Sequence, residues 1–143
     1  MSFRSVVGVF GEVFLTFILC RLYNVKAVWC GYGSLDVIVF EPDGVLFKRA
    51  SLIEVKTRDM KERWPSTPPS RGTILKMQSK NVNYDKFIAF IPYFINKKEG
   101  LQIAIYLITV SIIDINDLSW FRQSRFKGEY QLSIAKIIME VKG

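Results

Sequence analysis

Three charged residues stand inside two short segments that are otherwise rich in valine, isoleucine and leucine. Asp36 lies within LDVIVF (35–40), and Glu54 and Lys56 lie within SLIEVKT (51–57). A charge in a buried sheet costs free energy unless a partner compensates for it, and aspartate is depleted in strands. Two carboxylates with a lysine are able to hold a metal ion and act on a phosphodiester, so these residues are candidates for an active site.

The spacing of these residues predicts that they meet on one face of a sheet. Side chains alternate across a strand, so Glu54 and Lys56 face one side while Val55 faces the opposite, buried side. The residues EPDG favour a chain reversal between the two segments. If the segments pair after this reversal, Asp36 lies beside Glu54 on the same face.

A helix is predicted over residues 5–23, where apolar residues recur at intervals of three and four. Ser5, Gly8, Glu12 and Thr16 fall on one narrow stripe of this helix, which is small and polar. Glu12 is therefore expected to cover the sheet face that carries the other carboxylates.

Crowded carboxylates repel one another, and a bound cation resolves that repulsion. Donors that are all oxygen favour Mg²⁺, with Mn²⁺ as a substitute, and the backbone carbonyl of Val55 is a further candidate ligand. Lys56 would orient the attacking water or hold a phosphate oxygen. A lone Glu-x-Lys on a strand also occurs as a solvated pair without chemistry, and this alternative stays open.

The charge of the chain favours a polyanionic partner such as nucleic acid or an anionic membrane. The 143 residues carry a formal net charge of +7, and the sequence pI is near 9.5. Residues 48–80 hold nine Lys or Arg against three Asp or Glu, which is +6 of that total. The residues expected to contact a nucleic-acid backbone are Lys48, Arg49, Arg58, Lys61, Arg63, Arg71, Lys76 and Lys80.

Residue types that are absent or scarce exclude several kinds of chemistry. The chain has no histidine, which excludes Ser-His-Asp and Cys-His catalysis and His-ligated metals. Cys20 and Cys30 lack a C-x-x-C spacing and are expected to be free and buried in a reducing compartment. The apolar stretches 6–20 and 101–113 are too short to span a membrane, and no signal-peptide cleavage site follows the first. We therefore expect a soluble, cytoplasmic protein without a membrane partner.

The order of the predicted elements favours an α/β fold with a central mixed β-sheet. One domain is expected over residues 1–143, with a mobile basic Pro/Ser loop at about 58–70. Pro92 favours an edge position or a bulge in the strand that contains it. The remaining predictions are strands over 26–30, 86–95, 101–115 and 130–140, a helix from about Arg71 to Tyr84, and a short helix over 116–123.

The residues GSLDVIVF…SLIEVKTR, with an upstream helical Glu in GEVFLTFIL, resemble the PD-(D/E)xK nuclease superfamily. The likeness covers roughly residues 5–90, and its core is D-x(17)-E-x-K together with the helical Glu. Within the superfamily it is most similar to archaeal Holliday-junction resolvases. Leu35 departs from the pattern, because the family name has Pro at that position.

The resemblance implies a restriction-endonuclease-like mixed sheet flanked by helices, a requirement for Mg²⁺ and cleavage of DNA phosphodiester bonds. Carried over by position, Asp36 and Glu54 become metal ligands, Lys56 the catalytic lysine and Glu12 an auxiliary ligand. Ser34 matches a serine that contacts the scissile region in the resolvases. The partners it implies are branched or otherwise structured DNA and a second copy of the chain, paired through the apolar C-terminal half.

Some assignments remain open from the sequence. Gln78 or Lys80 corresponds to a polar residue that many family members carry on the helix after the Glu-x-Lys strand. A nucleic-acid-binding module that keeps the fold without chemistry is the alternative function, and an interaction or assembly protein is a third. A prokaryotic or viral origin is expected.

Overall fold

The computed structural model describes residues 3–32, 35–40, 46–47, 50–59, 71–78, 84–116 and 135–141. These residues form a mixed six-stranded sheet with two α-helices, which confirms the predicted α/β class. The helices are α1 (Phe3–Leu22) and α2 (Arg71–Gln78), and a 3-10 helix, η1, spans Val110–Ile112. The strands are β1 (Lys26–Tyr32), β2 (Leu35–Phe40), β3 (Ser51–Asp59), β4 (Asp85–Asn96), β5 (Gly100–Thr109) and β6 (Ala135–Val141).

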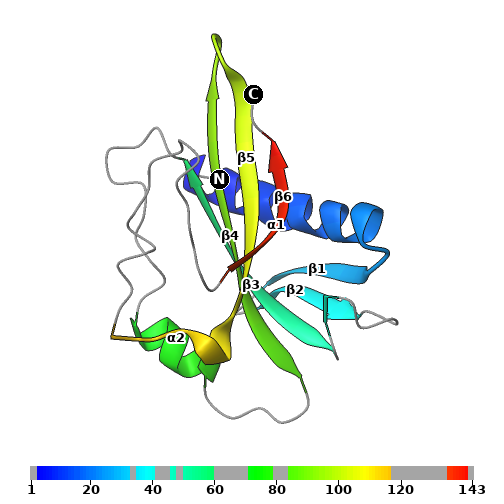
Figure 1. Cartoon of the computed structure of the whole chain (residues 1–143), viewed down its shortest axis with the longest axis vertical. Helices are drawn as coiled ribbons and strands as arrows, with labels where there is room; N and C mark the ends of the chain where they lie inside the picture. Colours follow the sequence, from blue (N-terminus) through cyan, green and yellow to red (C-terminus); the bar gives the residue numbers. More distant parts are fainter. Residues whose placement is uncertain are drawn as a thin grey trace.

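The strands lie in the order β1-β2-β3-β4-β5-β6, so each strand pairs with its neighbours in the sequence (Figure 1). Among the described strands, β3 and β4 pair in parallel and every other neighbouring pair is antiparallel. Parallel strands need a crossover between them, and α2 lies in that connection.

The two helices cover opposite faces of the sheet. Along β3, buried and partly exposed residues alternate, as the sequence predicted. The odd-numbered residues of β2 and β3 share a core cluster with α1, whereas even-numbered residues of β4 and β5 form a second cluster with α2. The first cluster includes Leu15, Leu19, Val37, Ile53 and Val55; the second includes Ile74, Ile88, Phe90, Tyr106 and Ile108.

Gly11 allows α1 to lie directly against β3. A Cβ atom at Gly11 would overlap the Thr57 hydroxyl and lie 2.9 Å from the Thr57 Cβ, whereas a Cβ at Gly8 would have no neighbour within 4 Å. This close approach fixes the height of the helix above the strand, and with it the position of Glu12.

Gly11→Ala is expected to lower the free energy of unfolding by about 1–3 kcal/mol, because the helix must move away from Thr57. Gly8→Ala is the matched control, and it should be neutral or stabilise by about 0.5–1 kcal/mol, since alanine is favoured in helices. Urea unfolding followed by circular dichroism measures both. Equal effects of the two substitutions would show that the contact with Thr57 is not tight.

Pro92 lies in an interior strand, so the predicted edge position is wrong. The strand that contains it, β4, pairs with β3 on one side and β5 on the other. The recorded β4–β5 pairs pass from Phe90↔Tyr106 to Tyr93↔Ile103 without a change of register, so no bulge forms there. Proline has no N–H to donate, and the ladder is interrupted at this point instead.

Several predicted boundaries differ from the structure. Arg58 belongs to β3, so the predicted loop begins later than residue 58, and residues 60–70 lie outside the described part of the chain. Helix α2 ends at Gln78, and Tyr84 is not helical. Strand β5 ends at Thr109, where η1 follows. Apart from Asn116, the predicted helix over 116–123 falls outside the described residues, as do the first residues of the last predicted strand.

Part of the apolar C-terminal half packs inside the chain. Residues 103–108 of β5 are buried between β4, β6 and the clusters on both faces. Leu101, Ile112, Ile137 and Val141 of the same half are exposed, so the interface expected from it, and with it the homodimer, stays a prediction.

Candidate active site

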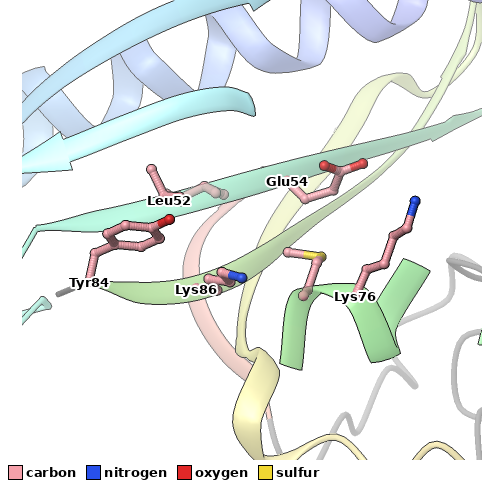
Figure 2. A pocket seen from close by; sticks show the side chains of 7 residues that line it. Leu52, Glu54, Lys76, Tyr84 and Lys86 are labelled. Carbon is pink, nitrogen blue, oxygen red and sulfur yellow. The ribbon is translucent and has the colours of Figure 1, made fainter. Parts of the chain in front are cut away.

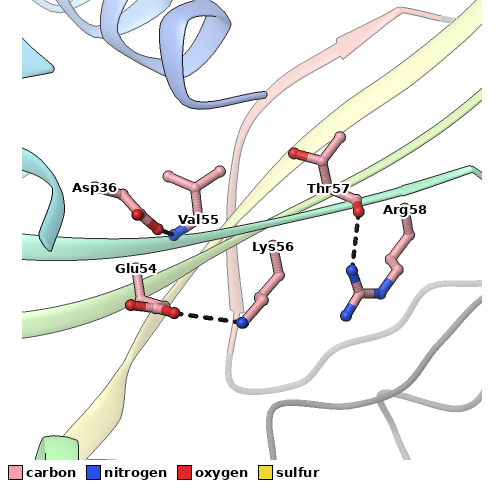
Figure 3. A network of polar contacts seen from close by, with 6 residues as sticks. All are labelled: Asp36, Glu54, Val55, Lys56, Thr57 and Arg58. Carbon is pink, nitrogen blue, oxygen red and sulfur yellow. Dashed lines mark hydrogen bonds and ion pairs between the residues drawn. The ribbon is translucent and has the colours of Figure 1, made fainter. Parts of the chain in front are cut away.

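Strands β2 and β3 separate at Asp36, and this separation creates the candidate site. Their recorded pairing ends at Val37↔Ile53. Beyond that pair, the backbone N–H of Val55 donates a hydrogen bond to Oδ2 of Asp36, at 2.7 Å (Figure 3). The carboxylate thus stands where a backbone acceptor from β2 would stand in a continued ladder.

The Asp36 carboxylate consequently lies at the edge of β3. A backbone N–H points along the plane of the sheet, so its acceptor lies in that plane rather than above either face. Val37 and Val39 face α1, so alternation places Asp36 on the side of Glu54 and Lys56, as predicted, but its carboxylate turns to the strand edge. The reason is the missing ladder partner of Val55, which the side chain replaces.

Glu54 and Lys56 form an ion pair on the face opposite α1. Their Oε1 and Nζ atoms are 3.3 Å apart, and the side chains keep 19% and 27% of their exposure. Val55 between them is buried in the cluster that includes α1. The predicted alternation of these three residues is therefore present in the structure.

Glu12 approaches Asp36 from the face of the sheet opposite to Glu54. It lies in α1, which packs on the Val55 face and not, as predicted, on the face of Glu54. The carboxyl groups of Glu12 and Asp36 are nevertheless close enough to share a hydrogen bond. Asp36 at the strand edge is thus the neighbour of Glu12 on one side and of Glu54 on the other.

Burial raises the pKa of Asp36 from its ordinary value of 3.8 to about 6. The negative charge of Glu12 and the hydrogen bond with it add to this increase in pKa. The Val55 N–H and the positive charge of Lys56 act in the opposite direction. The carboxyl group therefore holds a proton more tightly than an exposed aspartate does, and a cation would compete for the same place.

The pKa of Glu54 is also raised, first by burial and then by the negative charge of Asp36. The charge of Lys56 and its hydrogen bond lower it. The four side chains Glu12, Asp36, Glu54 and Lys56 therefore form one electrostatically linked series, in which each member acts on the next.

The donors of this series fit a hard cation such as Mg²⁺, because they are carboxylate oxygens. In the part of the chain that the structure describes, no three acidic or cysteine side chains lie close enough to form a ready-made metal site. Asp36 and Glu54 are the pair best placed to hold an ion, and the Val55 carbonyl points to the same strand edge as its N–H.

A pocket of about 430 Å³ adjoins Glu54 on its own face of the sheet (Figure 2). Its lining comes from β3, from α2, from the beginning of β4 and from the residue that precedes β4. The residues are Leu52, Ile53, Glu54, Lys76, Met77, Tyr84 and Lys86. Glu54 and Lys76 are predicted site residues, whereas Tyr84 and Lys86 are not. The sequence feature that could have identified them is a tyrosine and a lysine around the start of the strand that follows the Glu-x-Lys strand.

The predicted basic residues have different places in the structure. Lys76 lines the pocket, and Arg71 is exposed at the start of α2. The guanidinium of Arg58 donates to the carbonyl oxygen of Thr57, its neighbour in β3 (Figure 3). Ser34, Lys48, Arg49, Lys61, Arg63 and Lys80 lie outside the described residues.

Gln78 holds α2 to the chain after β5. Its side-chain amide donates hydrogen bonds of 3.0 Å to the carbonyl oxygens of Val110 and Ile113. This role is structural, and it positions the helix that forms one wall of the pocket.

Both cysteines are free, but the expectation that they are buried is wrong. Cys20 is exposed and Cys30 is partly exposed. Among the helices that the structure describes, none has the length and apolar character needed to cross a membrane. No family model, no curated protein and no solved structure matches the chain significantly.

Proposed function

We propose that the chain is a Mg²⁺-dependent endonuclease that hydrolyses phosphodiester bonds of DNA. The observation that carries this proposal is the position of Asp36, whose carboxylate fills the gap where β2 leaves β3. It is coupled there to Glu12 and Glu54, with Lys56 beside Glu54. Carboxyl groups with raised pKa values that gather around a lysine are typical of functional sites.

In this proposal Asp36 and Glu54 hold Mg²⁺, the Val55 carbonyl adds an oxygen, and Glu12 is an auxiliary ligand. A bound Mg²⁺ would supply the positive charge that polarises the phosphodiester and stabilises the negative charge developing on it. The Lys56 ammonium, 3.3 Å from Glu54, holds a phosphate oxygen or the attacking water. Water forms the new bond to phosphorus, the bond to the leaving oxygen breaks, and that oxygen takes up a proton.

The finer parts of the proposal rest on the resemblance to PD-(D/E)xK nucleases. They are a restriction-endonuclease-like fold, selectivity for branched DNA as in Holliday-junction resolvases, and a homodimer; a cytoplasmic location is proposed from the cysteines and the short apolar stretches. The mixed sheet with a helix on each face is compatible with the first of these. The free cysteines are compatible with a reducing compartment.

The test is cleavage of labelled DNAs by the wild-type protein. A four-way junction, a flap, a single strand and the component duplexes are incubated with Mg²⁺, with Mn²⁺ or with EDTA. We expect products with either metal and none in EDTA, with the branched DNAs cut faster than the duplexes. Binding that weakens with salt, but without cleavage in either metal, would overturn the proposal in favour of the non-catalytic binding module.

A further inference from the structure

The pocket beside Glu54 has the chemistry of a nucleotide site. Its volume of about 430 Å³ lies in the range of about 300–1,000 Å³ that is usual for small-molecule sites. That is more room than one phosphate group needs. Apart from Ile53, every residue of its lining is partly or fully exposed, so the pocket reaches solvent.

Two lysines enter the pocket from different elements. Lys86 stands near the beginning of β4, directly opposite Leu52 of β3, and Lys76 rises from α2 toward β3 (Figure 2). Ammonium groups from two walls are suited to the phosphate of a ligand that lies between them.

The remaining lining is suited to a base. The ring of Tyr84 and the side chain of Leu52 form part of the wall (Figure 2), and Met77 also lines it. Aromatic rings stack on nucleobases of any sequence, and apolar side chains cover the faces of the base and sugar. Cationic groups and an aromatic wall in one pocket therefore favour a nucleotide over a simple anion.

Glu54 belongs to both the pocket and the series that includes Asp36 and Lys56. A nucleotide in the pocket is consequently next to the place where the scissile phosphate would be held. A base that is paired in a duplex is held in the stack by its partner and its neighbours, and it must leave the stack to enter a pocket.

We propose that this pocket receives an unpaired nucleotide next to the scissile phosphate, with Tyr84 against the base and Lys76 and Lys86 on its phosphate. The inference rests on the proposed function, since it names the feature of DNA that the same site selects. Branch points, flaps and gaps offer such a nucleotide, whereas a continuous duplex offers one only after a base has been flipped out at a cost in free energy.

The test measures binding of two DNAs that differ at one position. Both are duplexes with 2-aminopurine at the same site, and in one of them the opposite nucleotide is missing. In EDTA at low salt, the wild type is expected to bind the duplex with the unpaired 2-aminopurine about 10-fold more tightly than the fully paired duplex. Binding is also expected to change the fluorescence of the 2-aminopurine. Tyr84→Leu and Lys86→Gln should each remove most of this preference.

Matched controls separate the pocket from general effects of ring or charge loss. Tyr84→Phe keeps the ring and should keep the preference, and Lys136→Gln removes an exposed lysine of β6 and should also keep it. Thermal unfolding checks each variant, and Lys86→Gln carries the test if Tyr84→Leu does not fold. Equal binding of the two DNAs by the wild type, or equal weakening of both by the pocket variants, would overturn the inference.

The result is independent of the nuclease proposal, because binding is measured without metal. A protein that prefers the unpaired form but never cleaves DNA would overturn the proposed activity and support the pocket. A protein that cleaves DNA in Mg²⁺ without any preference for unpaired nucleotides would support the proposed activity and overturn the role of the pocket.

Discussion

Replacing Lys56 with glutamine is expected to lower the rate of DNA cleavage about 10²- to 10³-fold at every Mg²⁺ concentration. The ammonium group stands on the same face as Glu54 and is the positive charge nearest to it among the recorded contacts. Its role in the proposal is to stabilise charge on the reacting phosphate, so more metal does not replace it. The measurement is the single-turnover cleavage rate of a flap DNA across a Mg²⁺ titration.

Glu54→Gln gives a comparison within the same ion pair. It is expected to show a loss of similar size at low Mg²⁺ that is partly recovered as Mg²⁺ is raised, because it removes a metal ligand and not the phosphate contact. Lys97→Gln, at an exposed lysine in the turn between β4 and β5, is the control and should cleave normally. Full activity of Lys56→Gln in a folded protein would contradict the assigned role.

The sequence predicts the part of the site that depends on strand periodicity. The alternation of Glu54, Val55 and Lys56 follows from the geometry of a single strand, and the structure contains it. The neighbourhood of Asp36 and Glu54 follows from the antiparallel pairing of their strands. Both are local in sequence, so a period of two and a turn signal were sufficient.

The position of the Asp36 carboxylate was not predictable in the same way. It depends on where β2 stops pairing with β3, and no residue type marks that point. The prediction of the sheet face that α1 covers was wrong for a related reason. The polar stripe with Gly8 and Glu12 suggested a helix facing the acidic residues, but α1 approaches the sheet through Gly11, which lies against Thr57 on the opposite face.

Tyr84 and Lys86 were missed because their role arises from tertiary pairing. Lys86 comes next to Leu52 only through the parallel alignment of β3 and β4, whose connection includes α2. Sequence patterns predict that such a crossover exists, but they do not give its register. The predicted extension of α2 to Tyr84 hid this residue from the site as well, since α2 ends at Gln78.

Asp36→Asn is expected to stabilise the metal-free protein at about pH 8 and to have little effect at about pH 4. The pKa of Asp36 is raised from 3.8 to about 6, so the folded state binds this proton more tightly than the unfolded state. Its contribution to stability is therefore present below pH 3.8 and is lost as pH rises through about 6. Asparagine avoids this loss, since its amide oxygen still accepts from Val55 and its amide nitrogen donates to Glu12. The expected gain is about 1 kcal/mol, discounted because Asp36 is partly exposed to solvent.

Urea unfolding in EDTA at the two pH values measures the difference in stability between wild type and Asp36→Asn. Adding Mg²⁺ should reverse the sign of this difference. A ligand that binds only the folded state stabilises it, so Mg²⁺ is expected to stabilise the wild type more than Asp36→Asn. Glu99→Gln, at an exposed carboxylate in the turn between β4 and β5, is the control and should show neither effect. Equal stability of wild type and Asp36→Asn at both pH values would mean that the ionised Asp36 carboxylate does not lower the free energy of unfolding. A carboxylate that destabilises the metal-free folded protein is expected at a site that binds a cation. If this residue only stabilised the fold, asparagine would do so better.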